Sequence, residues 1–247
     1  MALKFDIHGR YGFFKNHESN SVYMSYQFIH KPSVLGILGC IVGLDGWRQM
    51  KQHEGILEYY EVFKDTKISI IPKSSYFNVF YETINNSTGF VNIDASKKGG
   101  ATANIKRQIL QDPCYTIIIQ KEGISKEYYD KLKEMLFKGE STYPICLGNN
   151  TYKANITNVE EIELENINDN DDLIVESLIL ENKIEEVYEE SEDGIEQYES
   201  HTLLPIDYNI DTDYGHKKDK VCFSNHYIKV KKDCKLYKWN DKIYYFM

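Results

Sequence analysis

Two stretches near the start of the chain decide the fold: LKFDIHGRYGFF, residues 3–14, and SVLGILGCIVGL, residues 33–44. The first begins with alternating apolar residues, a pattern typical of a strand. The second places Gly36, Gly39 and Gly43 on one narrow stripe of a helix, where another backbone can approach closely. Glycine in a helix costs roughly 1 kcal/mol relative to alanine, so the stripe implies a compensating contact. The protein's own sheet is the expected contact, and a ligand or a partner backbone is the alternative.

Composition predicts a folded protein of one large or two small domains. The chain has 247 residues, of which 42% are apolar, so it can bury about 70–75% of its unfolded surface. Its five cysteines include no CxxC pair, which is typical of free thiols in a reducing compartment. No basic and apolar leader opens the chain, and its longest apolar run, residues 37–44, is too short to span a bilayer. We therefore predict a soluble, cytoplasmic protein without a membrane partner, a metal or a cofactor.

Charge is distributed unevenly along the chain. The whole chain has 29 basic and 38 acidic residues, a net charge of −9. Residues 160–199 hold 17 of the acidic residues and one lysine, which leaves 28 basic and 21 acidic residues elsewhere. The body is therefore mildly basic, and we expect the acidic segment to be a solvated loop or helix face. The alternatives are that the segment repels nucleic acid on one side or contacts a basic partner subunit.

The hydrophobic pattern predicts an α+β protein whose second part is rich in β-strands. In the first part the expected strands cover residues 3–8, 66–72, 115–120 and 143–147, and the expected helices cover 33–44 and 125–138. After residue 154 the helical signals fade, and strands are expected over 173–180, 202–206 and 221–230. A closing hairpin is expected over 235–246, around Asn240-Asp241. We therefore divide the chain into residues 1–154 and residues 155–247.

A long excursion, residues 74–112, separates two of the expected strands. Its outgoing arm, residues 76–81, is aromatic, and its returning arm covers residues 104–110. Between the arms, residues 96–100 combine lysines with glycines, as in a flexible tip. Long polar insertions in compact domains are usually functional or disordered, and the aromatic arm favours function. We therefore predict an extended hairpin.

The sequence contains no familiar catalytic or metal-binding motif. It has no GxSxG elbow, phosphate-binding GxxxxGK[ST], HExxH or Cys/His cluster with zinc spacing. The acidic residues near position 170 lack the glycine and the closing glutamate of a calcium loop. These absences set aside several enzyme classes.

The basic body instead mixes cations, aromatic rings and amides. RNA requires this mixture, because phosphates accept donors and positive charge while unpaired bases stack on rings. The candidate RNA-binding residues are His8, Arg10, Tyr11, Phe13, Lys15, Tyr26, Lys31, Arg48, Lys51, Lys97, Lys98, Asn104, Lys106 and Arg107. The alternative for each is that the ring belongs to the core and the cation is merely solvated.

The order of these segments resembles the Cas-five family of CRISPR-associated proteins, in the form found in type I-B effector complexes. The resemblance rests on residues 3–14, on KPSVLGILG at residues 31–39 and on KRQILQDPCY at residues 106–115. Weaker agreement continues through residues 143–148 and Leu204-Pro205. It covers most of the chain except the acidic segment. Each motif is short, so the order and spacing of the motifs carry the resemblance.

The resemblance implies a ferredoxin-like, RRM-related domain of the RAMP superfamily with a β-hairpin thumb, followed by a variable β-rich region. It implies a non-catalytic subunit of the Cascade surveillance complex in antiviral defence, which caps the 5′ handle of the crRNA. The implied partners are the crRNA, Cas-seven-type backbone subunits, a Cas-eight-type large subunit and target DNA near the protospacer-adjacent motif. The thumb would be residues 74–112, with phosphate contacts from Lys97, Lys98, Lys106 and Arg107. The residues placed near the handle would be Arg10, Lys31, Ser33, Gly36, Gly39 and Gly43.

Two alternatives remain open. Type I-C members of the same family cut precursor crRNA without a metal, using a tyrosine, a lysine and a histidine. Such chemistry needs a base near the 2′-hydroxyl and a cation near the phosphate, and His8 and His30 are the candidate bases here. The returning arm of the hairpin has no histidine beside its cations, so we prefer the non-catalytic function. The second alternative is an RNA-binding domain unconnected with CRISPR.

Overall fold

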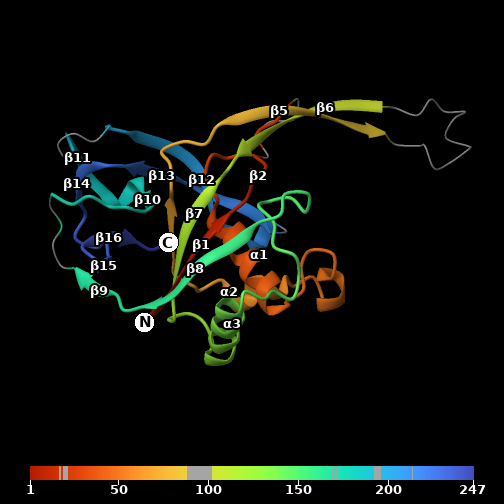
Figure 1. Ribbon diagram of the computed structural model, residues 1–247, viewed down its shortest axis with the longest axis horizontal. Helices are drawn as coiled ribbons and strands as arrows, with labels where there is room; N and C mark the ends of the chain where they lie inside the picture. The colour runs from red at the N-terminus through yellow and green to blue at the C-terminus, as the bar shows by residue number, and fades with distance from the viewer. Residues whose placement is uncertain are drawn as a thin grey trace, which may run out of the picture.

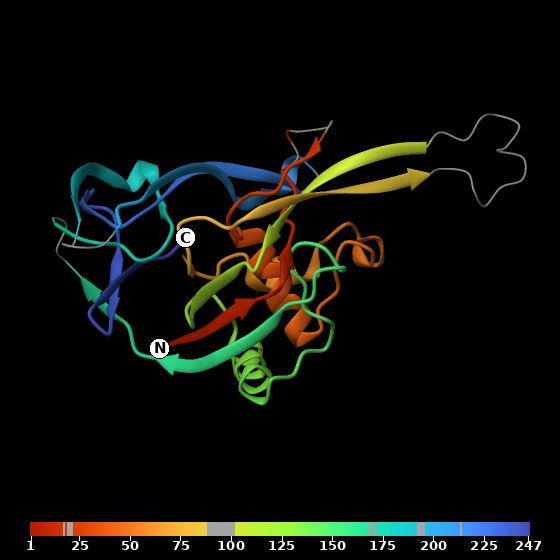
Figure 2. The ribbon, with the colours of Figure 1, turned by 45° about the horizontal axis from the view of Figure 1, so that its top comes forward.

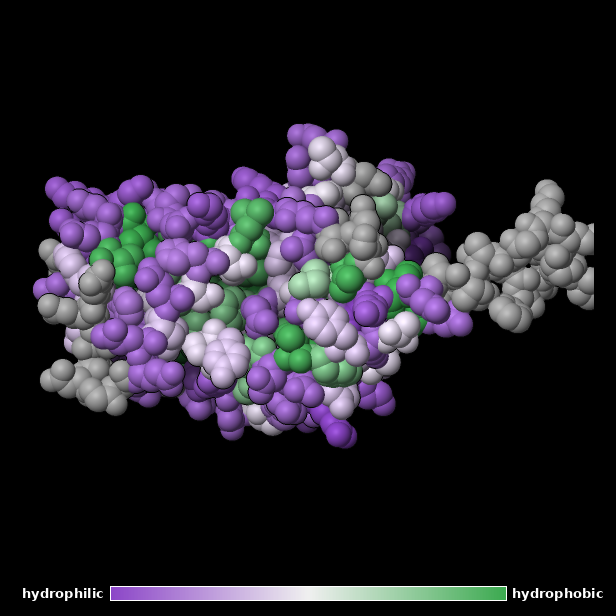
Figure 3. Space-filling view, turned by 90° about the horizontal axis from the view of Figure 1, so that it is seen from above, coloured by the Kyte–Doolittle hydropathy of each residue, from purple (hydrophilic) through white to green (hydrophobic). Residues whose placement is uncertain are grey.

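The structure is a computed structural model that describes residues 1–16, 18, 22–87, 102–167, 170, 172–191, 196–212 and 214–247. Strands predominate over helices, and a hairpin projects from one end of the body (Figure 1). None of the described helices is long and apolar enough to cross a membrane. Seen from above, the surface is mainly hydrophilic and its hydrophobic residues form small separate groups (Figure 3). The α+β prediction is confirmed.

Four antiparallel strands form the first sheet, in the order β4-β7-β1-β8. Their bounds are β1 Ala2–His8, β4 Ile68–Pro72, β7 Cys114–Gln120 and β8 Asn155–Ile162. Alternate residues of β1, namely Leu3, Phe5 and Ile7, are fully buried in the main core together with residues of the helices. The period-two pattern at the start of the sequence therefore marks the buried face of a strand.

The α-helices among the described residues cover one face of this sheet (Figure 1). They are α1 Lys31–Val42, α2 Glu58–Phe63 and α3 Lys126–Lys138, and a 3-10 turn covers Met50–His53. The helix predicted over 125–138 is confirmed, with Ser125 as its N-cap and Gly139, at φ +67°, as its C-cap. The sequence pattern did not predict α2.

The helix predicted over residues 33–44 begins two residues earlier than predicted, at Lys31. The His30 side chain is the reason, because its Nδ1 accepts a hydrogen bond from the Ser33 backbone N–H at 3.3 Å and so caps the helix. The helix ends at Gly43, which has φ +82° and donates its backbone N–H to the Gly39 carbonyl. Gly43 is therefore a left-handed C-cap, and its assignment to a stripe on the helix was wrong.

The glycine stripe is occupied by a neighbouring helix. A Cβ added to Gly39 would lie 2.5 Å from the Cβ of Tyr59 on α2, whereas one added to Gly36 would meet nothing closer than 3.9 Å. Gly39 is buried and Gly36 is half-buried. We expected the stripe to pack against the sheet. That expectation is wrong, because Gly39 packs against Tyr59 of α2 instead.

The predicted hairpin is confirmed over the described residues. Strands β5 Val79–Ser87 and β6 Thr102–Gln111 follow β4 and precede β7 along the chain, and they pair with each other in antiparallel register. Figure 2 shows them leaving the body. The base of β6 also pairs with β2 Tyr11–Gly12 and β3 Val22–Tyr23. The predicted tip, residues 96–100, lies outside the described residues.

In the second part, the described residues form three small sheets. Their orders are β10-β13-β12, β11-β14 and β16-β15-β9. The bounds are β9 Glu165–Ile167, β10 Ile179–Leu180, β11 Ile184–Ser191, β12 Glu199–Asn209, β13 Gly215–Ser224, β14 His226–Val230, β15 Leu236–Trp239 and β16 Lys242–Tyr245. The described residues of the acidic segment thus contain strands and one short 3-10 turn, Glu181–Lys183.

The two parts share one main core. Leu204, Val221 and Phe223 of the second part pack in the same apolar cluster as the helices of the first. The closing hairpin is confirmed, and its Asn240-Asp241 turn has φ +48° and +59°, as a type I′ turn requires. The predicted division after residue 154 falls just before β8, a strand of the first sheet.

Of the strand predicted over residues 173–180 only β10, Ile179–Leu180, is present, and the strand predicted over residues 143–147 is wrong. The segment makes only an isolated bridge, between Cys146 and Lys153. Pro144 has no backbone N–H to donate, and Gly148 turns the chain with φ +78°. All five cysteines are free thiols, as the sequence predicted.

Candidate nucleic-acid interface

A cleft lies at the N-terminal end of α1, between that helix and strands β12 and β13. We call it the α1 cleft. It consists of two hollows of about 650 and 450 Å³ that share Ser33, Trp47, Gly148 and Tyr208. Its walls therefore come from several separate parts of the chain: residues 14–15, α1 with His30 before it, the loop after α1, α2, residues 143–150 and the β12–β13 ribbon.

Aromatic rings form one wall of the larger hollow. His216 stacks on Tyr208 with ring centroids 5.4 Å apart and an interplanar angle of 28°. The Trp47 ring lies 5.9 Å from Tyr208 and 5.8 Å from Tyr214, in edge-to-face geometry, and Trp47 is 47% exposed. Such packing fixes the tryptophan while leaving part of its ring available to a flat ligand.

The polar lining of the larger hollow is rich in basic residues. Lys15, Lys218, His30 and His216 line it, and none of its described lining residues carries a carboxylate. The Lys15 Nζ lies 4.1 Å from the centre of the Tyr23 ring, a cation–π contact. The surroundings thus favour an anion beside an aromatic surface.

Lys218 differs from Lys15 because it has an acidic neighbour. Its Nζ lies 2.8 Å from Glu18 Oε1. Burial lowers the pKa of Lys218, but hydrogen bonds to Glu18 and Tyr26 outweigh burial and leave the pKa above its usual value. Lys218 is therefore a protonated cation at neutral pH.

The smaller hollow adds amide groups and a helix surface. Gly36 and Cys40 of α1 line it, together with Asn149 and Asn150. The one carboxylate among its described lining residues is that of Asp45, whose Oδ2 lies 2.9 Å from His53 Nε2. Amide side chains can both donate to and accept from nucleobase edges.

The hairpin presents a second polar surface. Cross-strand partners in an antiparallel pair project from the same face. The pairs Tyr81 with Gln108, Thr83 with Lys106 and Asn85 with Asn104 therefore lie in one row. All of them except Gln108 are exposed, and Tyr81 is 56% exposed. The row, which we call the hairpin face, combines a ring, a cation and amides.

Arg107 does not belong to the hairpin face. It points to the opposite side, where its guanidinium forms an ion pair with Glu82 and lies 5.2 Å from the Phe13 ring. The Tyr152 hydroxyl donates to the same Glu82 carboxylate at 2.7 Å. Only 12% of the Arg107 side chain is exposed. The structure places Arg107 in contacts within the base of the hairpin, and its phosphate contact stays a prediction.

Lys31 is also engaged within the protein. Its Nζ donates to the Met247 carbonyl at 3.3 Å. Burial lowers the pKa of Lys31, although Asp207 and Asp65 act in the opposite direction. Lys31 therefore contacts the end of the described chain rather than the α1 cleft.

The other predicted residues are dispersed. Arg48 is exposed beside Trp47, and the Arg10 guanidinium lies 5.4 Å from the Tyr11 ring. His8 and Tyr11 are half-buried at the junction of the first sheet and the hairpin. Lys97 and Lys98 lie outside the described residues. The α1 cleft thus brings together Lys15, Ser33 and Gly36, and the hairpin face brings together Asn104 and Lys106.

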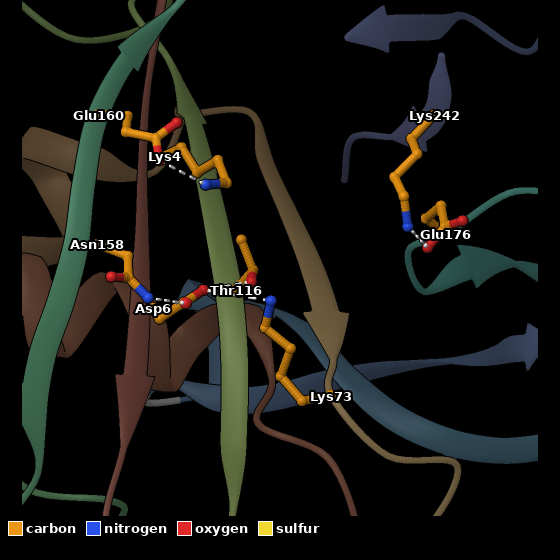
Figure 4. A network of polar contacts seen from close by, with 8 residues as sticks. All are labelled: Lys4, Asp6, Lys73, Thr116, Asn158, Glu160, Glu176 and Lys242. Atoms are coloured by element: carbon orange, nitrogen blue, oxygen red, sulfur yellow. Dashed lines mark hydrogen bonds and ion pairs between the residues drawn. The ribbon is translucent and has the colours of Figure 1, made fainter. Parts of the chain in front are cut away.

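The sheet face opposite the helices carries a paired network (Figure 4). Asp6 accepts hydrogen bonds from Asn158 at 2.8 Å and from the Thr116 hydroxyl, and its carboxylate lies 3.5 Å from Lys73 Nζ. Lys4 pairs with Glu160 at 3.3 Å. Lys4 and Lys73 are therefore both ion-paired on this face.

Several residues of the α1 cleft were not predicted from the sequence. Trp47, Tyr208, His216 and Lys218 were missed, as were Asn149 and Asn150. Trp47 adjoins the predicted Arg48, so an exposed aromatic beside a cation was the available signal. The residues of β12 and β13 had no such signal, because only tertiary packing brings that ribbon to α1.

Comparisons with solved structures match this fold. The chain is similar to one in a CRISPR RNA-guided surveillance complex, with TM-score 0.52 and 12% identity over 92% of this chain and 91% of that one. A CRISPR protein from Archaeoglobus fulgidus has TM-score 0.46 and 13% identity, covering 98% of each chain. No protein-family model and no curated protein matches the sequence. The chain therefore has a fold that occurs among CRISPR-associated proteins.

Proposed function

We propose that this protein is a non-catalytic RNA-binding subunit of a type I CRISPR effector complex. In this proposal it is a Cas-five family member of the I-B form, and it binds the repeat-derived 5′ handle of the crRNA. The resemblance of residues 3–14, 31–39 and 106–115 supports the family, and the similarity to a chain of a surveillance complex supports the fold.

The arrangement of the first sheet supports a ferredoxin-like domain. Its elements follow the chain order β1, α1, β4, β7, α3, β8, and the sheet order is β4-β7-β1-β8. A β-α-β-β-α-β sequence with its first and third strands adjacent is the pattern of that fold. The β5–β6 hairpin is inserted between the second and third strands, where we propose that it acts as the thumb.

The observation that carries the proposal is the lining of the α1 cleft. Trp47 and the His216 ring, which stacks on the buried Tyr208, provide surfaces for unpaired bases, and Lys15 and Lys218 provide charge for phosphates. Single-stranded RNA is held by this combination of stacking and charge. We infer that handle nucleotides occupy the α1 cleft, while the hairpin face contacts a Cas-seven-type backbone subunit and the adjoining crRNA.

Binding of a synthetic handle RNA tests this proposal. We expect Lys15→Ala with Lys218→Ala to weaken binding and to reduce the slope of log K against log salt by about 0.7 for each lost phosphate contact. Lys138→Ala is the matched control, because Lys138 is an exposed lysine at the end of α3. Equal affinities and equal slopes for the double variant and the control would contradict RNA binding in the α1 cleft.

One observation favours the alternative function of an endoribonuclease. The rings of His30 and His216 lie 5.3 Å apart in the larger hollow, near two lysines. However, both His30 ring nitrogens contact Ser33, with Nε2 3.1 Å from its hydroxyl, so the ring serves as a helix cap. Metal-free incubation with repeat RNA distinguishes the two functions. A defined cut that His216→Ala abolishes would favour the nuclease.

A further inference from the structure

A cluster of three metal-binding side chains lies on β12 and β13. It comprises Glu199, His201 and Cys222, and one ligand atom from each lies within 4.8 Å of the other two. His201 and Cys222 are direct partners across the two strands, so they project from the same face. Glu199 precedes His201 by two residues and therefore shares that face. The register of the ribbon thus brings a thiol, an imidazole and a carboxylate together.

The His201 ring is held by carboxylates on both sides. Its Nε2 lies 2.7 Å from Glu199 Oε1, and its Nδ1 lies 3.0 Å from Glu181 Oε1. A histidine that binds a metal through one nitrogen commonly donates the other N–H to a carboxylate, which fixes the tautomer and the ring orientation. Glu181 is placed to accept that hydrogen bond while Nε2 faces the cluster.

The cluster is buried at Cys222, and a further buried histidine lies beside it. Cys222 is 1% exposed, and burial, with the nearby Glu199 and Glu181, raises the pKa of its thiol to about 11. His226 has its Nδ1 4.0 Å from Glu199 Oε2. Both His226 ring nitrogens are buried, and neither has a hydrogen-bond partner among the described residues. Buried ring nitrogens without hydrogen-bond partners destabilise the folded state, and a water bound to a metal ion here would give His226 such a partner.

We propose that Cys222, His201 and Glu199 form a zinc site in which water takes the fourth position and Glu181 orients His201. Thiolate, imidazole and carboxylate are the ligands that zinc accepts in tetrahedral sites, with bonds of roughly 2.0–2.3 Å. Tetrahedral ligands at such bond lengths lie about 3.3–3.7 Å apart, so small side-chain rotations complete the site. On binding, the Cys222 thiol loses its proton to solvent and the sulfur forms a bond to the metal.

The site escapes motif searches because its ligands are not close in sequence. His201 and Cys222 are separated by the whole β12–β13 turn, and no CxxC or HxxxH spacing accompanies them. The sequence-based expectation of no metal rested on such spacings. Cross-strand pairing produces the same proximity without a motif.

Metal titration of the full-length protein tests the site. The protein is stripped with a chelator and titrated with Zn²⁺, and separately with Co²⁺, whose thiolate complexes have a characteristic charge-transfer absorption. We expect one ion per chain and the cobalt–thiolate absorption, which requires no variant. We also expect Cys222→Ala and His201→Ala to lose the ion, and Glu181→Gln to weaken binding roughly 10- to 100-fold.

Two matched variants give the test its specificity. Cys234→Ala removes another buried thiol, whose pKa is also raised to about 11 by burial, and it should retain the ion. His53→Ala disrupts a second candidate cluster, Asp45 with His53 and Glu58, and should also retain it. Failure to bind either metal, or a metal that survives Cys222→Ala but not His53→Ala, would overturn the assignment.

Discussion

Asp6 shows how one side chain links three strands of the first sheet. Burial raises the pKa of Asp6, but hydrogen bonds from Asn158 and Thr116 and the charges of Lys73 and Lys4 outweigh it, so the pKa lies below its usual value. Asn158 reaches the carboxylate from a left-handed position, φ +52°, in a β8 segment whose register shifts beside β1. The irregularity therefore serves to direct a donor at Asp6.

We predict that Asp6→Asn destabilises the protein in a pH-dependent way. The folded-state pKa is depressed, so the stabilisation is fully present above the unfolded pKa of about 3.9 and is lost as the pH falls through the lower folded-state pKa. Urea unfolding should give a loss of about 1–3 kcal/mol at neutral pH. The difference from wild type should shrink in acid. Asp241→Asn, at an exposed turn, is the control, and equal losses for both variants would contradict the account.

Trp47 is the residue whose replacement should most affect RNA affinity. Stacking of one base on an aromatic ring contributes about 1–3 kcal/mol, so Trp47→Ala should weaken handle binding roughly 5- to 150-fold. The salt dependence should not change, because no charge is removed. Phe137→Ala removes a similarly exposed ring, 53% exposed on α3, and should bind normally. Fluorescence anisotropy with labelled RNA measures both, and identical affinities would exclude stacking on Trp47.

At the scale of elements, α1 contains a matched pair of glycines. Gly39→Ala would force its Cβ against Tyr59, which lies 2.5 Å away, and should cost about 1–3 kcal/mol of stability. Gly36→Ala meets only the edge of the same ring at 3.9 Å and should be neutral or stabilise by up to about 1 kcal/mol. Thermal unfolding of the two variants measures the difference. The reverse order would show that α2 does not pack as described.

The two faces of the hairpin should respond differently to mutation. Arg107→Ala leaves Glu82 without its ion pair and should cost about 1–3 kcal/mol of stability. Lys106→Ala, on the exposed face, should leave stability unchanged while weakening assembly with the partner subunits and RNA. Unfolding and co-purification measured on both variants separate the effects. A stability loss at Lys106 and none at Arg107 would reverse the assignment.

Sequence periodicity predicted those elements that one strong local pattern determines. The strand at residues 3–8, the helix at 125–138 and the hairpin over 74–112 are of this kind. The apolar run at 143–147 was misassigned, because its bridge and turns depend on contacts with residues 149–153. Helix α2 was missed, since six residues give too short a periodic signal.

The candidate site was predicted only in part, for a reason that belongs to the whole molecule. Lys15, Ser33 and Gly36 came from the first part of the chain, where local motifs exist. Their partners Tyr208, His216 and Lys218 come from β12 and β13, which pack against α1 through the shared core. Sequence patterns give the faces of a strand but not the distant helix that it will contact.

Sequencing of the RNA that co-purifies with the protein tests the central claim most directly. The full chain is expressed with Cas-seven-type and Cas-eight-type subunits and a repeat-spacer array, and the bound RNA is sequenced from its 5′ end. We predict a ribonucleoprotein whose RNAs begin with one repeat-derived handle, and a reduced yield for Trp47→Ala but not for Phe137→Ala. Two results would contradict handle binding: a yield for Trp47→Ala equal to that of the wild type, or bound RNAs with scattered 5′ ends.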